Sequence, residues 1–171
     1  MNQEELDKVL IEHNKWYMGK GGHRAYLQGA DLQRADLRGA DLQSAYLRDT
    51  IYEGVNWLLL LGIVPDSKGN ARAYKIINDK GEGIFQGGIN YLEAEKFTVP
   101  KVDTDINTQC SYGINLATLA WCLTEKQIGT RLLLMEFKFN GAICPIGSDG
   151  KFRVKSCTKV GECDWKGNLI P

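Results

Sequence analysis

Histidine is almost missing from this chain, because His13 and His23 are the only two and both lie near its start. The cysteines are odd in number, and no two of them are spaced as Cys-X-X-Cys. Such a set argues against a disulfide framework and against a zinc site. We therefore expect reduced, mostly buried thiols, with neither a metal nor a cofactor. The five cysteines are Cys110, Cys122, Cys144, Cys157 and Cys163.

The chain also lacks a long apolar run and a net charge. Its densest apolar run, residues 57–64, is eight residues long, whereas a membrane-spanning helix needs about 20. The 21 basic and 21 acidic residues cancel, which leaves no whole-chain electrostatic footprint for nucleic acid. The first residues are acidic and polar, so we expect no signal peptide. These absences predict a soluble, cytoplasmic protein without a membrane partner.

What the chain does contain is a repeat over residues 25–49. Five successive five-residue units each begin with alanine and carry leucine at the third position. A period of five drifts against the roughly 3.6 residues per turn of an α-helix, so the leucines would not form a stripe on one. We expect the alanines and leucines to point inward and the other positions to face water. The leucines are Leu27, Leu32, Leu37, Leu42 and Leu47.

These units resemble the pentapeptide-repeat family, whose unit is Ala-(Asp/Asn)-Leu-X-X. The resemblance implies a right-handed, four-sided (quadrilateral) parallel β-helix with one unit on each side. Five to seven units make less than two such coils, which is too little to bury a core alone. The repeat should therefore pack on something else as a packing or assembly scaffold, and its open edges favour a homo-oligomer.

Some members of the family imitate the shape and charge of a DNA duplex. Between Arg24 and Asp49 this chain has four arginines and four aspartates. The wall of the repeat is therefore neutral, and it is also too short to imitate a duplex. We do not expect DNA mimicry here.

The parts around the repeat complete an α+β fold. Residues 3–18 have the apolar spacing of an amphipathic helix, which we expect to cap the repeat, with Trp16 as an anchor. The predicted units are a capping helix (1–24), the repeats with a degenerate cap (25–64) and a mixed α/β domain with an antiparallel sheet and one main helix (71–171). Turn residues at 65–70 separate the last two.

Within residues 71–171 we expect strands at 73–78 and 97–101 and a three-strand meander at 132–139, 142–146 and 151–160. Asn140-Gly141 and Asp149-Gly150 are strong hairpin signals. The glycine-rich stretch 81–90 lacks a phosphate-loop pattern and favours a turn or hairpin. The main helix is predicted at 115–126, with Asn115 as its N-cap.

Residues 110–122 and 149–155 resemble an uncharacterised domain that is often attached to pentapeptide repeats in phage genomes. Residues 12–25 likewise resemble the lead-in of many phage-encoded pentapeptide proteins. The resemblance implies a phage-type protein that acts in the cytoplasm of a bacterial host. It brings no known activity with it.

Two features of this domain suggest a binding site. A helix beginning after Gly113 would offer free N–H groups and a positive dipole end to an anion, although an ordinary capped helix explains the same residues. Period-two spacing places basic residues on one face of strand 151–160, including Lys159, although a solvated face explains them too. An aromatic such as Tyr91 could stack on a base. The candidate ligand-binding residues are Tyr112, Gly113, Asn115, Thr118, Trp121, Lys151, Arg153 and Lys155.

Catalysis is not expected, because a nucleophile usually needs a partner base and no histidine follows His23. Cys110 and Cys122 lack an evident partner, and Asp103 and Asp105 fall in a polar loop. We predict a non-enzymatic protein that sequesters a phosphate-bearing small molecule, such as a cyclic nucleotide, in counter-defence. The alternative is a protein-interaction module that inhibits a host nucleic-acid-associated protein. An enzyme acting on nucleotides is the third and least favoured hypothesis.

Overall fold

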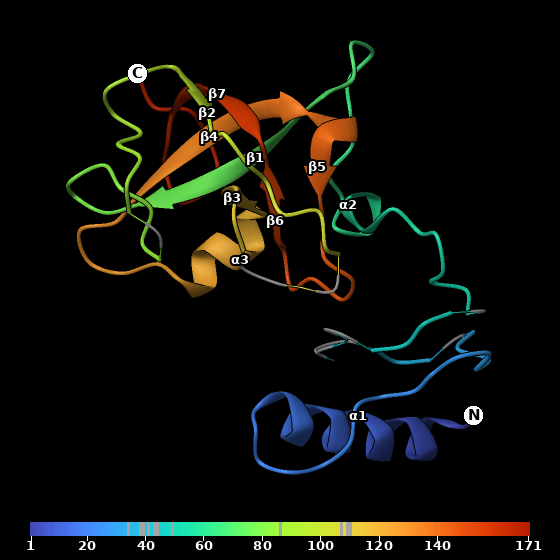
Figure 1. Cartoon of the computed structure of the whole chain (residues 1–171). Helices are drawn as coiled ribbons and strands as arrows, with labels where there is room; N and C mark the ends of the chain where they lie inside the picture. Colours follow the sequence, from blue (N-terminus) through green and yellow to red (C-terminus); the bar gives the residue numbers. More distant parts are fainter. Residues whose placement is uncertain are drawn as a thin grey trace.

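The computed structural model describes residues 1–33, 35–37, 40, 42, 45–48, 50–85, 87–106, 108 and 111–171. It consists of an N-terminal helix, a short coil of repeats lying against that helix, and a curled antiparallel sheet beyond the coil (Figure 1). This arrangement confirms the α+β class in its coarse form. In the described part of the chain, no helix is long and apolar enough to cross a membrane.

Helix α1 (Gln3–Tyr17) begins at a capping box. The Asn2 side chain accepts a hydrogen bond from the Glu5 N–H, and the Glu5 carboxylate accepts one from the Asn2 N–H, which satisfies two donors that a helix start leaves open. Leu6 and His13 are the buried residues of α1, and Leu6 packs into the apolar cluster of the repeat. The predicted N-terminal helix is confirmed, and it contacts the repeat through Leu6.

Each repeat unit turns with the same hydrogen bond. The N–H of a unit's first residue donates to the C=O of the leucine three residues earlier, which closes a β-turn. This bond recurs five times at a spacing of five residues, which explains why the unit has that length. The bonds are Ala30 to Leu27 (3.0 Å), Ala35 to Leu32 (3.1 Å), Ala40 to Leu37 (3.0 Å), Ala45 to Leu42 (2.9 Å) and Thr50 to Leu47 (3.2 Å).

The start and the end of the coil lie side by side, where Tyr26 pairs with Tyr46 in a parallel β-bridge. Leu27 N–H donates to the Tyr46 C=O over 2.9 Å, and Tyr46 N–H donates to the Ala25 C=O over 3.0 Å. The offset between Tyr26 and Tyr46 is 20 residues, which equals four five-residue units. A regular right-handed β-helix is not shown by the described residues of the coil.

The inward positions of the repeat are occupied as predicted. Four of the five leucines are buried, the fifth (Leu37) is partly buried, and Ala25 and Ala45 are buried with them. Four of the eight residues on which the predicted charge balance of the wall rests lie outside the described residues, namely Arg34, Arg38, Asp41 and Asp49. The four buried leucines are Leu27, Leu32, Leu42 and Leu47.

The short helix α2 (Trp57–Leu60) joins the repeat to the sheet. Trp57 packs against the apolar cluster of the repeat and stacks on Tyr52 with ring centroids 5.9 Å apart. The next residue, Leu58, is buried in the main core of the sheet together with Ile63. The apolar run 57–64 was expected to cap the repeat, and it is instead shared between the two cores.

The sheet has seven antiparallel strands in the order β2-β7-β4-β1-β3-β6-β5. The main core lies on its inner face and contains Ile77, Leu133, Met135 and Phe152. The predicted edge strand is confirmed as β2, although its bounds differ. The strands are β1 (Asn70–Ile77), β2 (Lys96–Thr98), β3 (Ile114–Ala117), β4 (Arg131–Lys138), β5 (Ala142–Ile143), β6 (Lys151–Val154) and β7 (Ser156–Cys163).

The predicted strand 151–160 is two strands. β6 and β7 are separated by a bend at Lys155, yet β4, β1 and β3 lie between them in the sheet. The sheet must therefore curl, so that a chain leaving β6 enters β7 directly. The alternation slips at the bend as well, because Phe152 and Val154 are buried before it and Cys157 is buried after it.

The predicted meander is wrong in its first pairing and confirmed in its second. Among the described strands β4 pairs with β1 and β7 and not with β5, whereas β5 pairs with β6 as predicted. Asn140-Gly141 does not form a two-residue hairpin turn, because it lies in a short 3₁₀ helix, η1 (Phe139–Gly141). The contacts that decide this pairing join strands far apart in the sequence, which turn signals do not encode.

The predicted helix 115–126 is also corrected. Asn115 lies in strand β3, and the helix α3 (Leu119–Thr124) begins four residues later. Thr118 is its N-cap, because the Thr118 Oγ1 accepts a hydrogen bond from the Trp121 N–H over 3.2 Å. Leu116, which falls within the predicted helix, lies instead in β3 and is buried in the main core of the sheet.

Candidate functional site

The sheet has a weak seam between β1 and β3. β1 pairs with β4 along its whole length, but it pairs with β3 only through Tyr74 and Ala117. A cavity of about 270 Å³ lies at this seam, lined by both strands, by α3, by β6 and by the loop that follows β1. The side chains that matter most for its chemistry are Tyr74, Lys75, Phe85, Asn115, Trp121 and Lys151.

Lys75 is the most unusual of these residues, because it is a lysine with only 9% of its surface exposed. Its Nζ donates a hydrogen bond of 2.9 Å to the Asn115 backbone C=O and lies 5.1 Å from the centroid of the Tyr91 ring. Burial penalises the charged ammonium and lowers the pKa of Lys75 to about 8.

The groups that act electrostatically on Lys75 are neutral at physiological pH. Burial raises the pKa of Tyr91 far above its usual value, and it raises the pKa of the Cys122 and Cys157 thiols to about 12. No carboxylate is among the causes of the Lys75 shift in the described residues. The cavity therefore holds a cationic group that an anion would stabilise.

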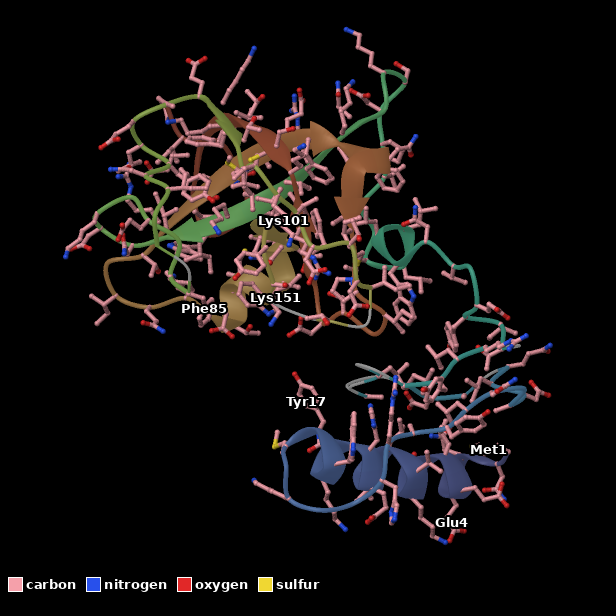
Figure 2. All side chains as sticks on the ribbon, viewed as in Figure 1. Met1, Glu4, Tyr17, Phe85, Lys101 and Lys151 are labelled. Atoms are coloured by element: carbon pink, nitrogen blue, oxygen red, sulfur yellow. The ribbon has the colours of Figure 1, made fainter. Side chains whose placement is uncertain are left out.

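A second cation lies among aromatic rings at the same cavity. Lys151 Nζ is 5.1 Å from the Trp121 ring centroid and 3.6 Å from the Asp149 Oδ2. The Trp121 Nε1–H donates to that same carboxylate oxygen over 3.1 Å. The Phe85 ring lies across from Trp121, with centroids 6.0 Å apart, and Figure 2 shows Phe85 and Lys151 on the same side of the sheet.

Three of the predicted ligand-binding residues meet here, namely Asn115, Trp121 and Lys151. Asn115 contributes as a strand residue, so the anion site predicted at a helix start does not exist. Thr118 caps α3 and lines a neighbouring groove. The role of these four residues in ligand binding stays a prediction.

Tyr112 and Gly113 lie away from the cavity lining. Tyr112 is 71% exposed, with the Lys101 ammonium 5.8 Å from its ring centroid. Gly113 has a φ of +143°, and a Cβ there would lie 3.1 Å from the Arg153 Cβ and 3.0 Å from the Val102 Cγ2. A glycine is therefore favoured at this position by packing, and its role in ligand binding stays a prediction.

Arg153 was predicted as a ligand-binding residue on an accessible basic strand face, and the face is wrong because the Arg153 side chain is buried. Its guanidinium donates to the backbone C=O groups of Asp103 (2.6 Å), Thr108 (2.6 Å) and Asp105. Arg153 thus holds the loop that precedes β3. Its fork of donors suits this task, and the Asp103 carboxylate lies 4.0 Å from its Nη2.

Two other lysines of the predicted basic face, Lys155 and Lys159, lie in different surroundings. Lys155 is exposed at the bend between β6 and β7. The Lys159 Nζ donates to the Tyr91 C=O over 3.0 Å. The face does not exist as a ribbon because the strand carrying it is broken.

Sequence reasoning missed Lys75, Tyr74 and Phe85. A signal for Lys75 was present, because Ala71, Ala73 and Ile77 share its parity along the strand and are all buried. A lysine on the inward face of a strand is rarely buried without a reason. Phe85 lies in the glycine-rich stretch 81–90, where no period marks it.

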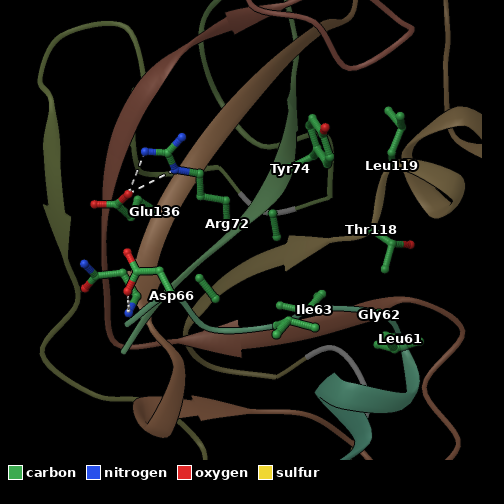
Figure 3. A pocket seen from close by; sticks show the side chains of 13 residues that line it. Leu61, Gly62, Ile63, Asp66, Arg72, Tyr74, Thr118, Leu119 and Glu136 are labelled. Carbon is green, nitrogen blue, oxygen red and sulfur yellow. Dashed lines mark hydrogen bonds and ion pairs between the residues drawn. The ribbon is translucent and has the colours of Figure 1, made fainter. Parts of the chain in front are cut away.

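A second, wider groove of about 540 Å³ runs between residues 61–64, the outer face of β1 and the start of α3 (Figure 3). Its one arginine, Arg72, is paired with Glu136, with the Arg72 Nε 3.0 Å from the Glu136 Oε2. This pairing neutralises the charge that an anionic ligand would need. The cavity at the β1–β3 seam is therefore the better candidate.

Thiol catalysis finds no support in this region. Burial raises the pKa of Cys122, Cys144 and Cys157 to about 12, and a protonated thiol is a poor nucleophile. Cys110 lies outside the described residues. Among the residues that the structure describes, no three or more His, Cys, Asp or Glu side chains gather in a way that would hold a metal ion.

Comparison with protein families matches residues 23–51 to the model for pentapeptide repeats (8 copies). This segment is the coil and does not reach the sheet. Comparison with curated proteins and with solved structures found no match, and no enzyme family was found. The similarity of the sheet region to a phage-associated domain stays a prediction.

Proposed function

We propose that this protein binds a small phosphate-bearing ligand with one planar ring, in the cavity between β1 and β3, and does not turn it over. The observation that carries the proposal is the buried ammonium of Lys75, which the described residues leave without a carboxylate partner. Burying an unpaired charge is costly. A ligand phosphate would offset that cost.

The rest of the cavity supports such a ligand. Lys151 adds a second positive charge, although it shares that charge with Asp149. Trp121 and Phe85 present ring faces and edges against which a planar base can stack. Cations beside aromatic rings are the combination that nucleotide binding uses.

The volume narrows the ligand class. Typical small-molecule pockets have roughly 300–1,000 Å³, and this cavity of about 270 Å³ lies below that range. A cyclic mononucleotide therefore suits it better than a cyclic di- or trinucleotide. Sequestration of such a signal in phage counter-defence is the cellular role we propose, because it requires binding without turnover.

Titration calorimetry tests the proposal with cyclic mononucleotides, cyclic dinucleotides and inorganic phosphate. We expect the mononucleotide to bind and Lys75→Met and Lys151→Met each to weaken binding about tenfold or more, since a hydrogen bond to a charged group contributes about 1.5–3 kcal/mol. Lys155→Met, an exposed lysine, is the matched control. Chromatography should recover the ligand unchanged, and an absence of heat for every anion at millimolar concentration would overturn the proposal.

A second candidate function is protein interaction through the repeat. Tyr26 and Tyr46 pack ring against ring and are 65% and 47% exposed, and the Arg24 guanidinium lies 4.0 Å from the Tyr46 ring centroid. Tyrosine, tryptophan and arginine are the residues that dominate binding energy at protein interfaces. A pull-down with the natural chain and with a Tyr26→Ala/Tyr46→Ala variant tests this, with light scattering to detect a homo-oligomer. Equal capture by both proteins would count against this surface.

A further inference from the structure

We propose that the Lys75 amine reacts reversibly with small aldehydes that enter the cavity at the β1–β3 seam, forming an imine. The ligand class that fits best is an aromatic aldehyde bearing a phosphate or carboxylate. The inference rests on the cavity of the proposed function, but it does not require that a nucleotide be the ligand.

The first support is the position of the amine. Lys75 lines the cavity, and its Nζ is held by one hydrogen bond to the Asn115 C=O. That carbonyl accepts a single hydrogen and positions the nitrogen. Positioning a reactant in this way removes part of the entropic barrier to attack.

The second support is the protonation state. An ordinary lysine is almost wholly protonated at neutral pH, whereas burial lowers the pKa of Lys75 to about 8. About a tenth of the molecules then carry the neutral amine at pH 7. Desolvation of a lysine in an apolar pocket is a recognised way to make it nucleophilic.

The reaction needs no further reactant. The Lys75 nitrogen lone pair attacks the aldehyde carbon, a C–N bond forms, and the electrons of the C=O π bond move to oxygen. The two hydrogens of the neutral amine leave with that oxygen as water, and a C=N bond remains. Burial around the nitrogen limits the water that would reverse the step.

The third support is the rest of the cavity lining. It includes Trp121 and Phe85, whose ring centroids are 6.0 Å apart and which offer apolar surface to a ring attached to the aldehyde carbon. Lys151 supplies positive charge for an anionic substituent on that ring. A ligand that carries an aldehyde, a planar ring and an anionic substituent would engage Lys75, the two aromatic side chains and Lys151.

The position is hard to explain by stability alone. Lys75 stands between Ala73 and Ile77 on the inward face of β1, where a methionine or leucine would pack without the cost of burying a charge. A reactive amine at this position would account for the cost of burying the charge.

The test is reductive trapping of the full chain. The protein is incubated with pyridoxal phosphate, with pyridoxal or with neither, then treated with sodium borohydride, and labelled lysines are identified by peptide mass spectrometry. We expect Lys75 to be labelled at least about tenfold more than the exposed Lys155 at pH 7, from the difference in neutral amine. The label should disappear from this site in Lys75→Met, a variant that removes no packing volume and should fold.

The outcomes separate this inference from the proposed function. Labelling of Lys75 no greater than that of Lys155 would overturn imine formation, while nucleotide titration would still decide the proposed function. Equal labelling by pyridoxal and by pyridoxal phosphate would support the imine and contradict recognition of a phosphate. A preference for pyridoxal phosphate that is lost in Lys151→Met supports both.

Labelling across pH gives a second measurement. Labelling of Lys75 should rise with pH and level off above about 8, the pKa of its amine, and labelling of the exposed Lys155 is recorded beside it for comparison. The other titratable groups around Lys75 are Tyr91, Cys122 and Cys157, whose pKa values burial raises so that they stay neutral in this range, and the Lys151 side chain also lines the cavity. Parallel pH profiles for the two lysines would contradict the inference.

Discussion

The repeat and the sheet are stabilised by contacts of different range. In the repeat the same turn bond recurs every five residues, and the coil closes between residues that are four units apart. In the sheet, β6 and β7 follow each other in the chain but have three strands between them. The repeat therefore distributes its stability over equal positions, whereas the sheet depends on single groups that join distant segments.

Arg153→Ala should show this dependence of the sheet most strongly. The substitution leaves three backbone carbonyls of the loop before β3 without the guanidinium that they share. Hydrogen bonds from a charged group contribute about 1.5–3 kcal/mol each, and the Arg153 side chain that makes these three is buried, so we expect the free energy of unfolding to fall by about 3–5 kcal/mol. Urea unfolding followed by tryptophan fluorescence measures the change.

Lys155→Ala is the matched control for Arg153→Ala. Lys155 is an exposed basic residue two positions further along, and we expect a change within about 0.5 kcal/mol. Comparable losses in the two variants would show that Arg153 does not hold the sheet as described.

Replacing one buried leucine of the repeat should lower the free energy of unfolding by less than Arg153→Ala does. The loss should be about the same at each of these leucines. Leu27, Leu32 and Leu42 are all buried in one apolar cluster, and a buried Leu→Ala change costs about 2–5 kcal/mol. We expect about 3 kcal/mol for each, measured by the same unfolding experiment. Gln33→Ala, next to Leu32 but exposed, is the control. Costs that differ between the leucines by more than about 2 kcal/mol would contradict an equal distribution.

The same difference in range explains what could be predicted from the sequence. The repeat could be predicted because its period is visible in neighbouring residues. Helix α1 could be predicted because its apolar spacing and its N-cap are local features of the sequence. The strand 151–160 was misassigned because its bend at Lys155 is set by pairing with β4 and β3, which no residue nearby encodes. Asn115 was misplaced because strand pairing with Arg153 overrides its helix-capping preference.

The candidate site was found only in part for the same reason. Trp121 and Lys151 were singled out for their chemistry, and the fold brings them to one cavity. Lys75 was overlooked although the alternation of β1 marks it as inward. The period shows that a residue is buried, but only the tertiary structure shows that its neighbours leave a cavity.

Lys75→Met should reverse the usual sign and stabilise the sheet. The folded-state pKa of Lys75 is about 8 and its ordinary value is 10.5. Between these values the unfolded chain binds more protons than the folded one, so the free energy of unfolding rises with pH across this window. Below pH 8 the natural chain carries the full penalty, about 3 kcal/mol at about 1.4 kcal/mol per pKa unit.

Methionine removes that penalty without leaving a void. We therefore expect Lys75→Met to be more stable by about 2–3 kcal/mol at pH 7, with an advantage that shrinks as the pH approaches 10.5. Thermal unfolding at pH 7 and at pH 10 checks both statements, with Lys155→Met as the control. An advantage that stays constant with pH would mean that packing, and not the ammonium charge, is responsible.

The smallest effect concerns the junction between the two regions. Gly147 lies in the loop between β5 and β6, and its neighbour Ile146 packs against the apolar cluster of the repeat. A Cβ at Gly147 would lie 2.6 Å from the Leu42 Cβ and 2.9 Å from its Cα. Gly147 also has a φ of +67°, a conformation that costs other residues about 1–2 kcal/mol.

Gly29 allows backbone strain to be separated from contact across the junction. It has the same φ of +67°, and a Cβ there would meet nothing within 4 Å. We expect Gly29→Ala to cost about 1 kcal/mol and Gly147→Ala about 1 kcal/mol more, because only the second pushes the sheet away from the coil. Hydrogen exchange at Leu42 and Ala45 should quicken in Gly147→Ala alone. Equal losses of unfolding free energy in the two variants would show that the repeat and the sheet fold as independent regions and that contact across the junction stabilises neither.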